Sequence, residues 1–221
     1  MLVEESIWFR ERLSYLIAEH ASAVVNIGSS TKLFREVIQP HLYLNIFQPL
    51  EQAGVQVIHL DRKTDVGVDI VGNLQDIDFI ATLKKMKYAG IFCNNLLMHL
   101  ELKERQELIK SIDSILPSRG YLFLSTSYNY PYCPDPNDSF YRPNNLGLEL
   151  LFPNYEVLES AVVNGHGSLY KDMTANKKYG LILTLRLVLP FYKFRSWKFL
   201  IRYLPNLFKP YSASCVVLRK N

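Results

Sequence analysis

The sequence predicts an α/β fold in which helices cover both faces of a mostly parallel β-sheet. Short apolar runs of strand length alternate along the chain with longer stretches of helical periodicity. The 221 residues suffice for one domain with a full core, and 48% of them are hydrophobic. Because no repeat or low-complexity linker divides the sequence, we expect a single domain over residues 1–221.

Seven strands are expected from apolar runs that end at glycine or polar residues. They cover Ala23–Ile27, Val55–Leu60, Gly67–Gly72, Tyr88–Cys93, Tyr121–Thr126, Tyr155–Val163 and Ala213–Leu218. Parallel neighbours in a sheet need a crossover connection, so the alternation with helices implies repeated βαβ units.

Helices are expected where apolar residues recur at helical spacing. They cover about Glu4–His20, Lys32–Ile38, Ile77–Met86 and Leu102–Leu116. Ser30 or Thr31 can cap the second of these helices, and Pro40 ends it.

The C-terminal part of the chain has a different charge from the rest. No Asp or Glu follows Asp172, and ten Lys and Arg residues give residues 173–221 a charge of +10. The first 172 residues carry −6, because 21 acids outnumber 15 bases there. Residues at about 179–210 are predicted to form a basic amphipathic helical insertion. Such an insertion either contacts an anionic membrane peripherally or packs as a lid on the domain.

Several classes of protein are disfavoured by composition. The N-terminal residues are acidic and lack the apolar core of a secretory signal, so we expect a cytoplasmic location, with peripheral contact at the inner membrane face as an extension. Three widely spaced cysteines argue against a disulfide framework and against a zinc site, and we expect no metal. The acidic body and the lack of a recognition motif argue against nucleic acid as a partner.

Polar residues follow the first two predicted strands, at the edge where ligands bind in parallel sheets. Gly28 permits a tight turn, and free N–H groups at the start of the next helix suit an anionic group. Asp61 follows the second strand and can accept both hydroxyls of a ribose. Each feature alone also fits an ordinary turn or a surface acid, but together they favour a nucleoside ligand.

Several segments along the chain resemble motifs of the class I S-adenosylmethionine-dependent methyltransferases. They are Val25–Thr31 (motif I), Val57–Asp61 (the ribose-binding strand), Gly67–Asp76 (beside the adenine), Cys93–His99 (after the fourth strand) and Leu116–Leu122 (before the fifth). Pro131–Pro143 also resembles a segment of bacterial methyltransferase-like proteins, some of them encoded with surface-glycan genes. The resemblance implies a Rossmann-like, doubly wound sheet of seven strands whose last strand is antiparallel.

The resemblance further implies S-adenosylmethionine as the cofactor. The positions that match its binding residues are Gly28, Ser29, Ser30, Asp61, Asn73 and Asn94. The chain departs from the family pattern at six positions, where it has Asn26, Ser30, Lys32, Asn73, Met98 and Cys133.

The expected acceptor is a small molecule or a glycan-like compound, bound beside the segment that follows the fifth strand. A hydroxyl acceptor benefits from a general base, and the candidates for catalysis are His99 and Asp138. The candidates for acceptor binding are Asp135, Tyr141 and Arg142. His99 could instead pack its own helix, and the two acids could instead form turns within the loop.

The sequence therefore predicts a methyltransferase that acts on a small-molecule or glycan-like acceptor. The alternative is a non-catalytic methyltransferase-like scaffold in a glycan-assembly or membrane-surface complex, which the departures from the family pattern and the basic tail favour. A nicotinamide-dependent enzyme is a third option, but its fingerprint needs three glycines where this chain has Gly28 alone.

Overall fold

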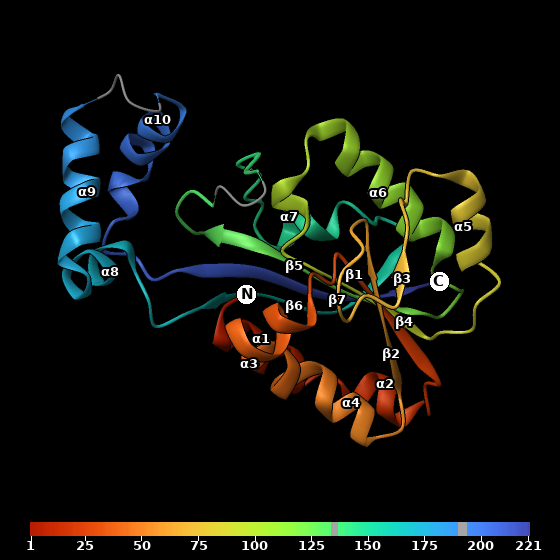
Figure 1. Ribbon diagram of the computed structural model, residues 1–221. Helices are drawn as coiled ribbons and strands as arrows, with labels where there is room; N and C mark the ends of the chain where they lie inside the picture. The colour runs from red at the N-terminus through yellow and green to blue at the C-terminus, as the bar shows by residue number, and fades with distance from the viewer. Residues whose placement is uncertain (134–136, 190–193) are drawn as a thin grey trace.

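The computed structural model describes residues 1–133, 137–189 and 194–221, and it is built on one seven-stranded sheet (Figure 1). Its strands are β1 (Ala23–Ile27), β2 (Gln56–Asp61), β3 (Ile70–Val71), β4 (Gly90–Asn94), β5 (Tyr121–Asn129), β6 (Tyr155–Asn164) and β7 (Ser212–Lys220). Their order is β3-β2-β1-β4-β5-β7-β6. The pairs among β1 to β5 are parallel, whereas β7 runs antiparallel to both β5 and β6. The predicted Rossmann-like α/β sheet with an antiparallel last strand is confirmed.

Helices lie on both faces of this sheet (Figure 1). The α-helices of the described residues are α1 (Val3–Arg10), α2 (Ser14–Ala18), α3 (Pro40–Leu42), α4 (Gln48–Gln52), α5 (Ile77–Leu83), α6 (Leu102–Ile115), α7 (Asn145–Glu149), α8 (Leu169–Ala175), α9 (Lys177–Val188) and α10 (Phe194–Tyr203), of which α8 to α10 lie beyond the end of the sheet. Shorter helical segments are the π-helical η1 (Phe34–Ile38) and η2 (Tyr43–Phe47) and the 3-10 turns η3 (Leu97–His99) and η4 (Leu204–Asn206).

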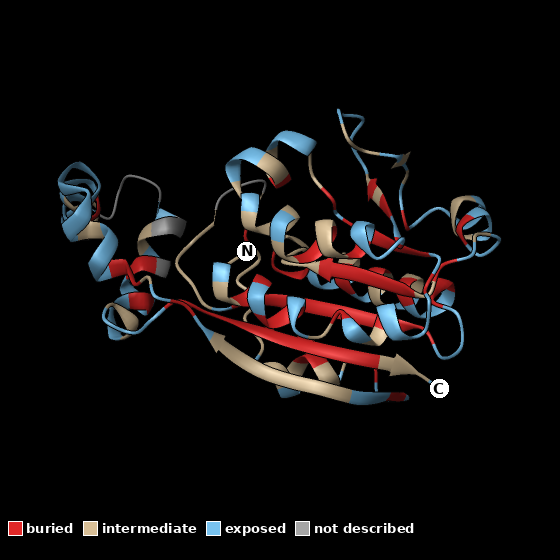
Figure 2. Cartoon of the chain, turned by 90° about the horizontal axis from the view of Figure 1, so that it is seen from below, coloured by how far each residue is buried: buried red, intermediate tan, exposed pale blue. Residues whose placement is uncertain are grey.

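The central strands are buried along their length, because each face of the sheet carries its own core (Figure 2). In β1, Val25 and Ile27 face the cluster under α5, α6 and α7, whereas Val24 faces the cluster under α1, α2 and α4. Phe92 of β4 and Phe123 of β5 stack in the second cluster, with their ring centroids 4.5 Å apart. Strands covered on both faces in this way read as continuous apolar runs, which is why β1 could be predicted from its sequence.

The structure differs from the prediction at three elements. The helix expected over 4–20 is two helices, because the Arg12 N–H donates to the Phe9 carbonyl while the Arg12 side chain binds the Trp8 carbonyl at 2.8 Å. The helix expected after β1 is the π-helical η1. The third strand is reduced to two residues, since Gly67 adopts a left-handed conformation (φ +83°) and its segment packs on Lys32 instead of joining the sheet.

The residues inserted between β6 and β7 form α8, α9 and α10, which lie at one end of the sheet and away from its core (Figure 1). A small apolar cluster that includes Leu183, Leu200 and Tyr203 joins them. No helix in the described part of the chain is both long and apolar enough to cross a membrane.

Candidate functional site

The turn after β1 is built on Gly28, as the sequence predicts. Gly28 has a φ of +68°, a conformation that costs little without a Cβ. A Cβ at this position would lie 3.1 Å from the side chain of Leu96, so the turn also brings the segment after β4 close to β1. Thr31 caps the following helix by accepting the Phe34 N–H at 3.0 Å.

Three N–H groups of this turn are bound within the protein, which corrects for them the expectation that they are free. The Ser29 N–H donates to the Leu60 carbonyl at 3.1 Å and the Lys32 N–H to the Val66 carbonyl at 2.9 Å. The Ser30 N–H donates to the Asp61 carboxylate at 2.8 Å. The end of β2 and the loop after it supply these acceptors, and a prediction from the β1 segment alone could not foresee them.

Asp61 lies at the end of β2, beside the turn, and is half-buried. Its Oδ2 accepts the Ser30 N–H and its Oδ1 accepts the Lys63 N–H at 3.2 Å. An ionised carboxylate offers about four lone-pair positions. Each oxygen of Asp61 therefore keeps capacity for another donor, such as a ribose hydroxyl.

Arg35 fixes the backbone of the turn with its buried side chain, and the sequence analysis did not identify it. Its side chain is buried (3% exposed) and donates to the carbonyls of Ser29, Ser30 and Gly67 at 2.9, 2.7 and 2.6 Å. Burial lowers the pKa of this guanidinium, and the charge of Asp69 opposes that shift most strongly. Nothing in the local sequence distinguishes this arginine from one on a solvated helix face.

The departure from the family pattern at Asn26 has a partner in the structure. The Asn26 amide contacts Nδ1 of His59 at 3.2 Å, between adjacent positions of β1 and β2. Burial and, to a smaller extent, the charge of Arg35 together lower the pKa of His59 to about 4. His59 is thus neutral at pH 7, and its unprotonated Nδ1 accepts from the asparagine amide, whereas an ionised aspartate could pair only with the tautomer that carries the hydrogen on Nδ1.

The two predicted asparagines lie at the same edge of the sheet. Asn73 is exposed and forms a turn before α5, in which its Oδ1 accepts the Gln75 N–H at 3.2 Å. Asn94 ends β4, and its Oδ1 lies 3.0 Å from the hydroxyl oxygen of Ser125. Gly28, Ser29, Ser30, Asp61, Asn73 and Asn94 therefore all lie at the carboxyl ends of β1 to β4 or in the segments that follow them.

Glu5 is a second residue of this edge that sequence analysis missed. It is 1% exposed, and its carboxylate accepts from the Asn95 side chain at 2.9 Å, the Ser125 hydroxyl at 2.5 Å and the Leu2 N–H at 3.0 Å. It ties α1 to the ends of β4 and β5. The only signal was an acidic pair, Glu4–Glu5, at the start of a helix rich in large apolar residues, but a solvated face explains such a pair equally well.

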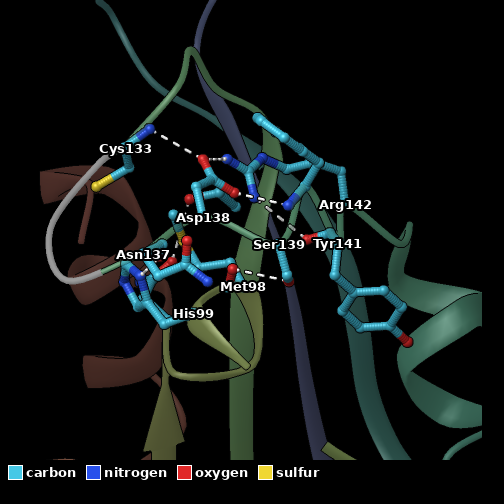
Figure 3. A network of polar contacts seen from close by, with 11 residues as sticks. Met98, His99, Cys133, Asn137, Asp138, Ser139, Tyr141 and Arg142 are labelled. Atoms are coloured by element: carbon cyan, nitrogen blue, oxygen red, sulfur yellow. Dashed lines mark hydrogen bonds and ion pairs between the residues drawn. The ribbon is translucent and has the colours of Figure 1, made fainter. Parts of the chain in front are cut away.

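The loop after β5 is organised around Asp138, which is fully buried (Figure 3). Its carboxylate accepts the N–H groups of Cys133 and Phe140 at 2.9 and 2.8 Å and pairs with the Arg142 guanidinium at 2.6 Å. A carboxylate enclosed in this way cannot contact a methyl-acceptor molecule. Asp138 therefore stabilises the loop, and the geometry does not support its predicted role as a general base. Arg142 is engaged in the same pair.

His99 lies where the loop docks on the segment after β4 (Figure 3). Its Nδ1 is paired with the Asn137 carbonyl, and the Ser139 N–H donates to the Met98 carbonyl at 2.8 Å. Because a carbonyl oxygen accepts, Nδ1 carries the hydrogen, and Nε2 is the acceptor atom of the neutral ring.

Two more residues, Tyr141 and Asp135, were predicted to bind the acceptor, and the structure describes only the first of them. The Tyr141 ring lies under the Arg105 guanidinium, 3.6 Å from the ring centroid, so one face of Tyr141 is covered. Asp135 lies outside the described residues. His99, Asp138, Tyr141 and Arg142 belong to one loop assembly, and Leu96 connects it to the Gly28 turn.

Two cavities lie elsewhere in the molecule. One of about 60 Å³ lies between Tyr132 and the helices α9 and α10, and one of about 470 Å³ lies between α5 and α6. Neither is lined by Gly28, Asp61, Asn94 or His99.

No protein-family model matches this sequence, and no curated protein matches it. Solved structures do match its fold. A SAM-dependent methyltransferase from Archaeoglobus fulgidus has 12% identity and a TM-score of 0.52, with 97% of this chain and 94% of that chain covered. Magnesium protoporphyrin IX methyltransferase from Synechocystis PCC 6803, with bound SAM, has 12% identity and a TM-score of 0.52, with 99% and 81% covered.

Coclaurine N-methyltransferase, bound to N-methylheliamine and SAH, has 15% identity and a TM-score of 0.52, with 97% of this chain and 70% of that chain covered. At these identities the likeness establishes the fold alone. The chain has the fold of the SAM-dependent methyltransferases.

Proposed function

We propose that this protein is an S-adenosylmethionine-dependent methyltransferase with a small, sugar-like acceptor. The observation that carries the proposal is the junction of β1 and β2, where the left-handed Gly28 turn is joined to the Asp61 carboxylate through the Ser30 N–H. This junction lies at the ligand-binding edge of the sheet. Two of the matching structures were solved with SAM or SAH.

The residues at this junction fit the proposed cofactor. Asp61 retains acceptor capacity for the ribose hydroxyls, and Gly28 lets the backbone make the tight left-handed turn beside it. Asn73 presents an exposed amide to an adenine edge, and Asn94 adds a polar side chain at the end of β4. When bound, S-adenosylmethionine supplies a methyl group activated on a sulfonium.

On the acceptor side, His99 is the proposed general base. The Asn137 carbonyl holds Nδ1 and fixes the ring, so Nε2 is the atom that takes the proton of an acceptor hydroxyl. Asp138 and Arg142 hold the loop that carries Asn137. The ring pair Tyr132–Phe140, with centroids 5.6 Å apart, supports a sugar-like acceptor, because aromatic faces suit sugar rings.

The test uses methyl transfer from labelled S-adenosylmethionine to a panel of sugars and small hydroxylated compounds. We expect turnover on at least one compound, and His99→Asn should lower its rate about 100-fold, the usual contribution of a general base. His20→Asn is the matched control, since His20 lies in an exposed turn before β1. Equal rates for both variants would remove His99 from the mechanism.

The second candidate function is a non-catalytic scaffold with the same fold. It is favoured by the internal use of three turn N–H groups and of both Asp61 oxygens. Cofactor binding without turnover on the whole panel would support the scaffold, and turnover would exclude it.

A further inference from the structure

The helices α9 and α10 form a hairpin that stands apart from the sheet (Figures 1 and 2). Its inner side is packed, because Leu183, Leu200 and Tyr203 are buried together with Leu169 and Tyr211. The hairpin therefore has a core of its own, and its outer side chains are not needed to fill it.

The outer side of α9 carries an apolar stripe. Leu181, Leu185 and Val188 lie at helical positions i, i+4 and i+7, on one face, and are 60%, 50% and 71% exposed. Phe194, at the start of α10, is 62% exposed and stacks on Trp197 with ring centroids 5.7 Å apart. A contiguous run of large apolar side chains exposed to solvent is typical of a surface that binds a protein or a membrane.

Exposed cations lie on both helices of the hairpin. Lys177 and Lys178 begin α9, and Lys198 and Arg202 lie on the exposed side of α10. No acidic residue follows Asp172 in the sequence, so nothing in the hairpin neutralises them. Positive charge beside exposed apolar and aromatic side chains complements a surface that is anionic outside and apolar beneath.

We propose that the outer face of the α9–α10 hairpin docks on an anionic lipid bilayer. The helices would lie in the plane of the interface, because the 12 residues of α9 extend only about 18 Å, less than the hydrocarbon thickness. Trp197 suits the interface, since its ring stacks on Phe194 while its Nε1 donates to the Leu187 carbonyl at 3.1 Å.

The hairpin attaches at the edge of the sheet that holds the candidate site. Ser212, where β7 begins, pairs with Asn129, where β5 ends, and the rings of Tyr130 and Tyr211 lie 4.9 Å apart. The membrane contact does not depend on methyl transfer, so it stands or falls separately from the proposed function.

Vesicle flotation tests the proposal with the full chain. We expect binding to phosphatidylcholine vesicles that contain 30% phosphatidylglycerol at low salt, and at least tenfold weaker binding to phosphatidylcholine alone or at 0.5 M NaCl. Val188→Asp should weaken binding to the anionic vesicles at least tenfold. The control is Ile77→Asp, because Ile77 is 83% exposed on α5, outside the hairpin.

The charge contribution is tested by Lys177→Glu with Lys178→Glu, against Lys84→Glu with Lys85→Glu next to α5. The hairpin pair should weaken binding more than the control pair. No binding to anionic vesicles, or equal binding by the Val188 and Ile77 variants, would overturn the proposal. So would a dimer in sedimentation velocity that Val188→Asp abolishes without any lipid binding, because the face would then be an interface between two copies.

Discussion

The turn after β1 and the loop after β5 are both held by one buried charged side chain, but the charges have opposite signs. In the turn, the Arg35 guanidinium binds three backbone carbonyls. In the loop, the Asp138 carboxylate binds two backbone N–H groups and the Arg142 guanidinium. A tight bend leaves backbone N–H and C=O groups without hydrogen-bond partners in a helix or sheet. In each region the buried charge binds such groups in place of water.

The difference lies in how each charge is neutralised. Asp138 has a direct ion-pair partner, so the loop is a closed and electrically balanced unit. Arg35 makes no ion pair within 4.0 Å in the described part of the chain, although the charges of Asp69, Glu36 and Asp61 act on it. The turn thus keeps positive charge and an acidic neighbour with spare acceptor capacity, which suits a zwitterionic ligand, whereas the loop is suited to holding a fixed shape.

The largest expected effect is on the loop. Asp138→Asn should lower the free energy of unfolding by about 3–5 kcal/mol, because it removes one partner of a buried ion pair. The asparagine N–H₂ would also face donors where the carboxylate accepted. Urea unfolding of both proteins measures the difference.

The control for this variant is Asp113→Asn, which removes a partly exposed ion pair with Lys220 at 3.7 Å and keeps an amide oxygen that can accept the Tyr155 hydroxyl. Exposed pairs contribute about 1 kcal/mol or less, so the control should change stability little. A loss below 1 kcal/mol for Asp138→Asn would show that the loop does not depend on its buried charge.

The next effect concerns the turn side and its dependence on pH. The pKa of His59 is lowered to about 4 in the folded protein, from 6.5 in the unfolded chain. The unfolded state therefore binds the extra proton first. The stability contribution is fully present above about pH 6.5 and is lost as the pH falls to about 4, with a total of about 3 kcal/mol at most.

Urea unfolding of wild type and His59→Gln between pH 7 and pH 4 isolates this contribution. Wild type should lose more stability than the variant over that range. In Arg35→Met the pH-dependent loss should be smaller, because the charge that helps lower the pKa of His59 is gone. Parallel curves for wild type and His59→Gln would contradict the assignment.

The smallest effect separates backbone strain from crowding at Gly28. Gly54→Ala should cost about 1–2 kcal/mol from the left-handed backbone alone, since φ is +80° and nothing lies within 4 Å of the new Cβ. Gly28→Ala should cost more, because its Cβ also meets Leu96 at 3.1 Å. When Leu96→Ala is already present, Gly28→Ala should cost no more stability than Gly54→Ala does. Equal costs at both glycines would mean that the segment after β4 does not press on the turn.

Much of the fold could be predicted because its strands are buried on both faces. β1 was predicted at its observed bounds, and the antiparallel last strand followed from the family resemblance. β3 could not be predicted at its true length, because the packing of Gly67 on Lys32 depends on contacts between separate segments. The break between α1 and α2 likewise depends on one side chain, Arg12, binding a carbonyl.

The sequence could predict where the residues of the candidate site lie, but it could not predict their hydrogen bonds and ion pairs. The Gly28 turn and Asp61 lie together as strand-end logic requires. Arg35 and Glu5 escaped prediction, because a buried charge and a solvated one look alike in a single sequence. Asp138 was predicted to be a catalytic residue for the same reason, since the sequence does not reveal how fully its carboxylate is enclosed.

The central claim is that the junction of β1 and β2 binds S-adenosylmethionine, and isothermal titration calorimetry tests it most directly. The proposal predicts saturable binding with one site per chain. Asp61→Asn should weaken that binding at least tenfold, while Asp65→Asn in the exposed loop after β2 should leave it unchanged. The absence of saturable heat at millimolar cofactor, or equal affinities for the two variants, would contradict the claim.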